Sequence, residues 1–256
     1  MAGTVTPTSL ALWARQFSTL INAGVSLVRC LLLLETIDDK RVSEATRDLR
    51  ARVEGGETLS LAMSAHPEVF NRLSLSLCRA GEVGGVLDET FAVWADWLER
   101  DLELRARLDM YYLLNQVGKW PVPREDYEAR LRMAIPDLDD RVREMTWCRL
   151  MGMMLDSGVP IIQSLEVATR EVYPENADPW VRGLHEAVRA GRSLAAALEE
   201  LGFSALTLQL VAVGEECRTI ERMLDMAARL LERGLNLRLS AALTAMVGPP
   251  EPIEEQ

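Results

Sequence analysis

The residues with the clearest potential for chemistry are acidic side chains. They lie at or just after a Gly-Glu pair, and this pair occurs twice in the chain. Glu82 belongs to the first pair, with Asp88 and Glu89 close behind it, and Glu215 belongs to the second. Each pair precedes the expected start of a long helix, where a carboxylate stabilises the positive end of the helix dipole. Helix capping is therefore the simpler interpretation. Contact with another subunit and a weak divalent-cation site are the alternatives, and the lack of a dense run of carboxylates disfavours the cation site.

Other residue types that bind metals or act as nucleophiles are few and isolated. The two histidines, His66 and His185, stand in unrelated sequence contexts. The four cysteines lack the paired spacing of zinc and redox sites, so we predict buried free thiols. These cysteines are Cys30, Cys78, Cys148 and Cys217. No zinc-peptidase, serine-hydrolase or nucleotide-loop motif occurs, so we expect a protein that is not an enzyme and has no catalytic residues, cofactor or metal.

The composition narrows the classes of partner. The chain has 256 residues, 48% of them hydrophobic, and a formal net charge of -11. Nucleic-acid binding needs a surplus of Lys and Arg to displace counterions, so no DNA or RNA partner is expected. A membrane-spanning helix needs about 20 apolar residues in a row, and the apolar run 239–247 is too short. It could touch a membrane weakly but not cross one, and without a secretory signal we expect a cytoplasmic protein.

An internal repeat organises the chain. Trp13 and Arg15 recur as Trp147 and Arg149, at an offset of 134 residues. Further matches at offsets of 133 to 135 are residues 20–26 with 154–160, Gly56 with Gly191, Phe70 with Phe203, Gly81 with Gly214 and Glu82 with Glu215. Because the offset drifts so little, the chain contains two copies of one domain.

Both copies have the spacing of amphipathic helices. Leu10, Trp13, Phe17 and Leu20 step by three or four residues, which places them on one helix face. No alternating pattern typical of strands occurs, so the sequence predicts an all-α protein of two tandem six-helix bundles related by the repeat. We expect the first bundle at 1–109, a proline-containing linker at 110–139, the second bundle at 140–243 and a disordered Pro/Glu tail at 244–256.

Glycines are expected to end several of these helices. A glycine just past the last helical turn takes the left-handed conformation, with positive φ, at little cost. The predicted turn glycines are Gly24, Gly56, Gly81, Gly85, Gly158, Gly191 and Gly214. The longest helix of the first copy is predicted from Leu87 to about Leu108. In the second copy Arg218 stands where Gly85 would recur, which disfavours tight packing at this turn.

Four segments of the first copy match, in order and spacing, the sequence pattern of a known protein family. They are residues 16–26, the segment 55–60 with its two glycines, Phe70, and the run 81–87. Together they resemble the F domain of the inner-membrane platform proteins of type II secretion and type IV pilus assembly. The second copy of this domain lies at 141–243. The resemblance implies a scaffold without catalytic residues that binds an assembly ATPase, other secretion or pilus machinery proteins and its own copies, as a homo-oligomer.

The chain departs from this family in its membrane part. Family members usually carry two membrane-spanning helices between the domains and a third after the second domain. The connection 110–139 is rich in charges and contains three prolines, so it cannot hold two spans. The chain is therefore either a relative that has lost its spans, peripheral to the inner membrane through its partners, or one in which a different linker replaced them.

The predicted partner surface lies on the longest helix of the first copy. Trp97 is off the apolar stripe that contains Trp94, which indicates a second buried face at a domain or subunit contact. With Trp97 we group Arg100 and Asp101, and the glutamates of the two Gly-Glu pairs are further interaction candidates. The favoured function is a secretion or pilus platform scaffold, and the alternative is a soluble adaptor or regulatory protein that keeps the fold without a secretion role.

Overall fold

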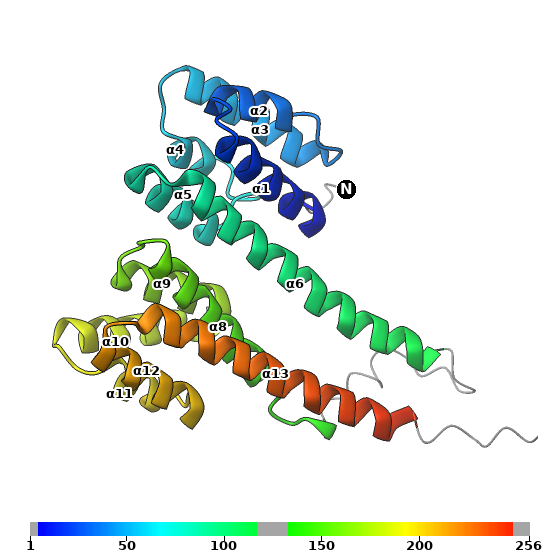
Figure 1. The fold of residues 1–256 in the computed structure, drawn as a ribbon, viewed down its shortest axis with the longest axis vertical. Helices are drawn as coiled ribbons and strands as arrows, with labels where there is room; N and C mark the ends of the chain where they lie inside the picture. The colour runs from blue at the N-terminus through cyan, green and yellow to red at the C-terminus, as the bar shows by residue number, and fades with distance from the viewer. Residues whose placement is uncertain (1–4, 117–132, 248–256) are drawn as a thin grey trace, which may run out of the picture.

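The computed structural model describes residues 5–116 and 133–247, and all regular structure within these ranges is helical (Figure 1). The predictions of an all-α fold and of a tandem repeat are confirmed. Most of the expected linker and the end of the expected tail lie outside the described residues.

Two long helices form the centre of the first copy. The N-terminal helix α1 packs along α6, and α5 packs against α6 beside it. The helices of this copy are α1 (Pro7–Asn22), α2 (Leu27–Leu34), α3 (Lys40–Glu54), α4 (Leu59–Ser64), α5 (Arg72–Gly84) and α6 (Leu87–Gln116). Polar caps begin three of them. Asp39 accepts from the backbone of α3, Thr58 from α4 and Asn71 from α5, which satisfies amide groups that have no partner inside the helix.

The second copy repeats this order. Its helices are α8 (Leu138–Asp156), α9 (Ile161–Val172), the short 3-10 helix η1 (Pro174–Asn176), α10 (Ala177–Arg189), α11 (Leu194–Glu200), α12 (Ala205–Cys217) and α13 (Ile220–Val247). Here α8 packs along α13, as α1 packs along α6. Both long helices, α6 and α13, point to the same side of the molecule (Figure 1).

The two cores are built from different side chains. In the first copy, five aromatic side chains pack together: Trp13, Phe17, Phe70, Phe91 and Trp94. The Trp13 and Phe17 rings stack with centroids 5.2 Å apart, and the Phe17 and Phe91 centroids are 4.4 Å apart. Such pairs add about 0.5–1.5 kcal/mol each to the burial of their apolar area. In the second copy Met151, Leu224 and Ala227 take three of these five positions, and all are buried.

The longest helix of the first copy extends further than predicted. The sequence predicts an end near Leu108, whereas α6 continues to Gln116. The physical reason is that no glycine or proline occurs before Gly118, so the chain meets no residue that breaks a helix. The helix therefore enters the segment expected to be linker, and the division of the chain into the four predicted segments stays a prediction.

Two predicted turn glycines have a different role. Gly24, Gly56, Gly85, Gly158 and Gly191 have positive φ, and so does Gly202, which was not predicted. Gly81 and Gly214, however, lie inside α5 and α12, so the prediction that they end helices with positive φ is wrong. They are glycines because of close packing. A Cβ at Gly214 would lie 2.8 Å from Cα of Ile220, and one at Gly81 would clash with Thr90. The absence of a side chain lets the next helix pass close by.

Candidate functional site

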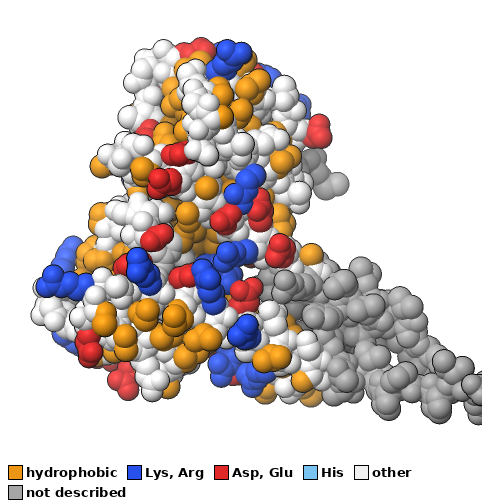
Figure 2. Space-filling model, viewed as in Figure 1, with side chains coloured by type: hydrophobic (Ala, Val, Ile, Leu, Met, Phe, Trp, Pro, Cys, Tyr) orange, Lys and Arg blue, Asp and Glu red, His pale blue; other side chains and the backbone are white. Residues whose placement is uncertain are grey.

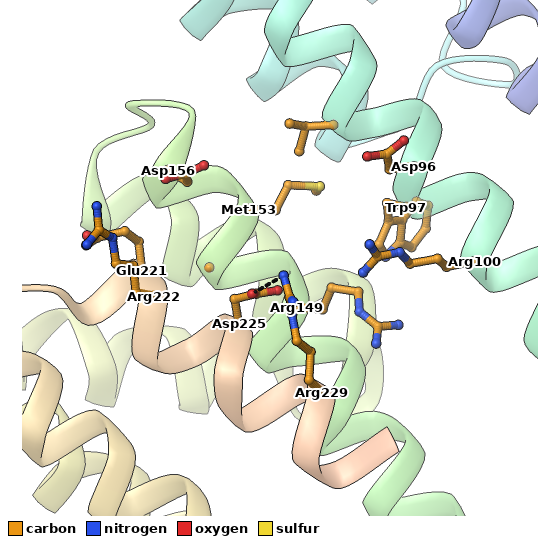
Figure 3. A pocket seen from close by; sticks show the side chains of 12 residues that line it. Asp96, Trp97, Arg100, Arg149, Met153, Asp156, Glu221, Arg222, Asp225 and Arg229 are labelled. Atoms are coloured by element: carbon orange, nitrogen blue, oxygen red, sulfur yellow. Dashed lines mark ion pairs between the residues drawn. The ribbon is translucent and has the colours of Figure 1, made fainter. Parts of the chain in front are cut away.

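A groove of about 310 Å³ lies between the two domains, where α6 faces α8 and α13. Charged side chains of both signs gather between the upper and lower domains in the space-filling view (Figure 2). Trp97 and Arg100 line the groove from α6, and Arg149, Asp225 and Arg229 line it from the second domain (Figure 3). The groove therefore combines an indole ring with cations and anions, a composition suited to contact with a protein surface.

Helix α6 brings two of the predicted interaction residues to this groove. Trp97 and Arg100 are three residues apart, which puts them on one side of the helix. Trp97 is half-buried and Arg100 is exposed. Asp101, the third predicted residue of this group, is half-buried and does not line the groove. Sequence reasoning missed the other wall, because nothing in the sequence shows that α8 and α13 face α6.

Gly152 sets the shape of the second wall. A Cβ at this position would lie 3.0 Å from the carbonyl oxygen of Glu221 and 3.1 Å from the backbone nitrogen of Asp225. Helix α13 can therefore approach α8 more closely than a larger residue would allow. This approach places Asp225, which forms a 2.8 Å ion pair with Arg229, on the floor of the groove.

An arginine pairs with a long-helix glutamate at the same place in both copies. Arg15 donates to Glu99 at 2.7 and 2.9 Å and also to Asp96. The guanidinium pKa of Arg15 is raised, first by the hydrogen bond to Glu99 and then by that to Asp96. In the second copy Arg149 donates to Glu232 at 2.9 Å. The Nε of Arg149 is buried without a hydrogen-bond partner among the described residues. The repeated pair joins the two central helices of each domain.

The two Gly-Glu glutamates cap helices, but not the helices expected. Glu82 accepts from the backbone nitrogen and the hydroxyl of Ser60, at 3.2 and 2.5 Å, at the start of α4. Glu215 accepts from the hydroxyl of Ser193 at 2.6 Å and from the backbone nitrogen of Leu194, at the start of α11. The expectation that they cap the long helices is therefore wrong. Both glutamates lie in the preceding helix, and their side chains tie it to a short helix.

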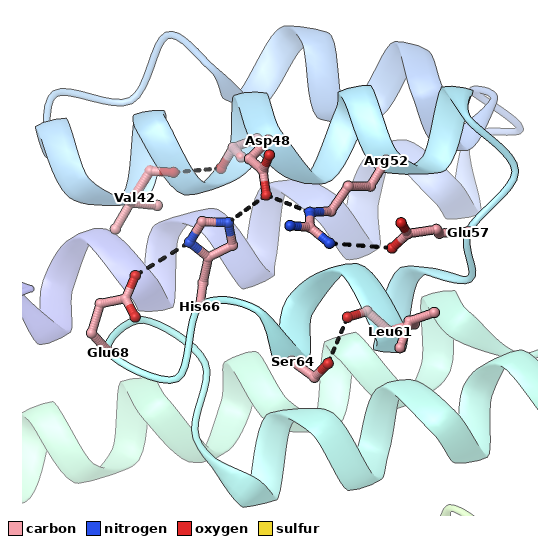
Figure 4. Close-up of polar contacts among 9 residues, drawn as sticks. Val42, Asp48, Arg52, Glu57, Leu61, Ser64, His66 and Glu68 are labelled. Atoms are coloured by element: carbon pink, nitrogen blue, oxygen red, sulfur yellow. Dashed lines mark hydrogen bonds and ion pairs between the residues drawn. The ribbon is translucent and has the colours of Figure 1, made fainter.

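His66 belongs to a polar cluster within the first domain (Figure 4). Its Nε2 lies 2.8 Å from Oδ2 of Asp48, and its Nδ1 lies 3.2 Å from Oε1 of Glu68. Arg52 donates to the same Asp48 oxygen at 2.6 Å. The pKa of Asp48 is lowered, first by the hydrogen bond from His66 and then by that from Arg52. The cluster joins α3 to the turn after α4.

The structure shows a buried carboxylate that sequence reasoning missed. Glu144 on α8 is 8% exposed and accepts from the backbone nitrogen and the hydroxyl of Ser204, at 3.0 and 2.6 Å. Thr207 donates to the same oxygen. These bonds satisfy the N-terminus of α12. The first copy has Leu10 at the matching position, so a comparison of the two copies was the available signal.

The cysteines divide into two kinds. Cys30, Cys78 and Cys148 are buried, as predicted, whereas Cys217 is exposed at the end of α12. The prediction for Cys217 is wrong because the residue lies at the last helical position, on the solvent side of the turn into α13. Burial raises the thiol pKa of Cys78 and Cys148, which keeps both thiols protonated and unreactive.

Neither a metal site nor a membrane span is found in the described part of the chain. Within residues 5–116 and 133–247, no three His, Cys, Asp or Glu side chains are grouped so that they could hold a metal ion. None of the helices described there is long and apolar enough to cross a membrane.

Comparison with known proteins assigns the family. The pattern of type II secretion system protein F matches residues 13–112 and 147–249. A type IV pilus assembly protein PilC of Myxococcus xanthus is 25% identical over 320 positions, covering 96% of this chain and 76% of that protein. The type II secretion system protein F of Xanthomonas campestris is 24% identical, covering 93% of this chain and 76% of the relative. Alignments of more than 300 positions exceed the length of this chain, so these relatives contain segments that it lacks. The chain belongs to the type II secretion system protein F family.

Proposed function

We propose that this chain is a non-enzymatic platform component of a type II secretion or type IV pilus machine. Its two domains would bind an assembly ATPase and other subunits of the machine at the cytoplasmic face of the inner membrane. The family supports the platform role, because relatives that align with more than nine-tenths of the chain are named as PilC and as protein F. The observation that carries the binding role is the interdomain groove, which presents Trp97 and Arg100 beside Arg149.

The arrangement suits the transmission of movement by contact. Each domain contributes its own buried side chains to the core, and an arginine-glutamate pair joins its central helices. The two domains meet through α5 and α9, with the groove beside this contact. A partner that binds both walls of the groove would change the angle between two stiff bodies. Movement of the ATPase would in this way reach the subunits being assembled.

A binding measurement with the purified chain and the assembly ATPase of its host tests this proposal. We expect the double variant W97A/R100E to bind at least tenfold more weakly than the unaltered chain, because it removes the aromatic anchor and reverses a charge. The variant R189E is the matched control. Arg189 is an exposed arginine on α10, away from the groove, and its reversal should leave binding unchanged. Equal loss with both variants, or binding of the ATPase unaffected by W97A/R100E, would contradict the assignment of the groove.

A further inference from the structure

The contact between the domains is a contact between two specific helix faces. Helix α5 of the first copy packs on α9 of the second. The side-chain amide of Gln163 donates to the hydroxyl of Ser76 at 3.3 Å. Arg72 forms a 3.9 Å ion pair with Glu166. Because the domain is repeated, each of these faces has an equivalent in the other copy. Helix α12 is the repeat of α5, and α2 is the repeat of α9.

Each copy therefore has one face of the α5 type and one of the α9 type. The contact inside the chain uses α5 of the first copy and α9 of the second. The face of α12 that repeats α5 and the face of α2 that repeats α9 stay uncovered. They lie at opposite ends of the molecule, α2 at the top and α12 at the bottom of Figure 1. The α2 face consists of Arg29, Leu32 and Leu33. The α12 face consists of Ala205, Leu206, Gln209 and Val213.

Both uncovered faces expose apolar side chains that their repeat partners do not. On the α2 face Leu32 is 52% exposed and Leu33 is 48% exposed, whereas Val167, the repeat of Leu33, is 6% exposed. On the α12 face Val213 is 45% exposed. Hydrophobic side chains also gather over α12 and α13 at the lower end of the space-filling view (Figure 2). Exposed apolar residues grouped on one helix face are typical of an interaction site.

Where the α2 face differs from the α9 face, the α12 face differs from the α5 face at the position opposite. Glu166 is replaced by Leu32 on the α2 face, and its ion-pair partner Arg72 is replaced by Ala205 on the α12 face. At this position a charged pair thus becomes an apolar pair. Where Gln163 meets Ser76 within the chain, Arg29 would meet Gln209, whose amide oxygen can accept from the guanidinium. The two uncovered faces therefore complement each other.

The apolar character of these faces is what a contact between separate molecules needs. A linker holds the two domains of one chain at an effective concentration of about millimolar, so a weak polar contact suffices there. A contact between two chains lacks this help and depends on the burial of apolar surface.

We propose that α2 of one molecule docks on α12 of a second copy of the chain, in the way that α9 docks on α5 within it. Such a contact joins two different faces, so it propagates head to tail and closes into a ring or continues as an open helical array. Because α6 and α13 point to the same side, repetition of the same step keeps every long helix on one side of the assembly. The inference does not depend on the secretion role.

Sedimentation velocity of the purified full chain tests this inference, at concentrations from about 1 µM to about 1 mM, the upper value matching the effective concentration inside the chain. The unaltered chain should rise above its monomer mass of 28.6 kDa as concentration increases. The variants L32E/L33E and L206E/V213E should each stay at the monomer mass. L61E is the matched control, since Leu61 is 55% exposed on α4, outside both faces, and it should assemble like the unaltered chain.

Mixing the two variants makes the test specific for a head-to-tail contact. Each variant keeps one intact face, so an equimolar mixture should form a complex of two chains and stop there. A symmetric contact between identical faces would not recover in this mixture. A chain that stays monomeric over the whole range, face variants that still assemble, or a mixture that stays monomeric would each overturn the proposal.

Assembly can be tested further by introducing the charge pair of the internal contact at the equivalent positions of the α2 and α12 faces. L32E should lose assembly, because it buries an unpaired carboxylate against Ala205. L32E/A205R recreates the pair formed by Glu166 and Arg72, so assembly should return and should weaken with added salt. Failure of the second change to restore assembly, with both variants folded by circular dichroism, would contradict the alignment of the two faces.

Discussion

The two copies of the domain reach the same helical arrangement with different cores. The first copy packs aromatic rings between α1 and α6, whereas the second places Met151, Leu224 and Ala227 at three of the corresponding positions. Gly152 of the second copy stands where the first has Ser18, and its missing Cβ allows α13 to approach α8. A smaller core thus goes with a glycine at the contact between the central helices. The comparison teaches that the fold depends on filled volume more than on particular side chains.

The largest expected effect comes from giving the first copy a residue of the second. Trp94→Ala should lower the stability of the first domain by about 3–5 kcal/mol, because the helices of this domain cannot close the cavity. Trp94→Phe should cost far less, since it keeps most of the ring and removes an indole N–H that has no partner among the described residues. Chemical denaturation followed by circular dichroism measures both. A small loss for Trp94→Ala would show that the first core can collapse to the smaller form.

The packing glycines should behave differently from exposed helix glycines. Gly214→Ala should lower stability by about 1–3 kcal/mol, because the new Cβ would collide with Cα of Ile220 and crowd the Met223 side chain on α13. Gly183 on α10 is the matched control, with no described neighbour within 4 Å of an added Cβ. Gly183→Ala should raise stability by about 0.5–1 kcal/mol, the usual gain of alanine over glycine in a helix. The same sign for both substitutions would refute the packing role of Gly214.

The turn before the long helix offers a reciprocal exchange between the copies. Gly85 has φ 69°, and Arg218, its counterpart, has φ 56°. A side chain in this left-handed conformation costs roughly 1–2 kcal/mol. Arg218→Gly should therefore raise stability by about 1 kcal/mol and Gly85→Arg should lower it by about 1–2 kcal/mol. Thermal melting of both variants checks the signs. A loss of stability in Arg218→Gly would mean that the arginine makes a compensating contact.

The smallest effect is expected at the His66 cluster, which the second copy does not repeat. The pKa of Asp48 is lowered in the folded chain, first by His66. A carboxyl with a lowered folded pKa stabilises the fold above its unfolded pKa, about 3.9 for aspartate, and this contribution is lost as the pH falls through the folded value. Asp48→Asn should therefore destabilise the chain at pH 6 and much less at pH 3. A constant difference between the two proteins across this range would contradict the expectation.

Helix positions followed from apolar spacing, the repeat from matching residues at a nearly constant offset, and the turn glycines with positive φ from glycine chemistry. Gly81 and Gly214 show where this reasoning stops. A glycine needed for a left-handed turn and one needed for close helix packing look alike in a sequence, and the distinction depends on tertiary distance. The predictions for Glu82 and Glu215 were wrong for a related reason. Each glutamate caps a helix that lies some twenty residues before it in the chain, and a local pattern does not show such a contact.

The candidate site could be predicted in part. Trp97 stood out because it leaves the apolar stripe of its helix. Trp97 and Arg100, which was grouped with it, line the groove, whereas Asp101 does not. The opposite wall, with Arg149 and Gly152, was not predictable from local pattern. Its position depends on how α5 packs against α9, and single contacts between distant helices leave no periodic signal in the sequence.

Mild crosslinking in the native host, followed by purification of the tagged chain and mass spectrometry, tests the platform role most directly. We predict that an assembly ATPase or another subunit of a secretion or pilus machine is recovered with it, crosslinked near Trp97 and Arg100. Recovery of the chain alone, or with unrelated soluble proteins, would contradict the platform role and favour an adaptor that keeps the fold.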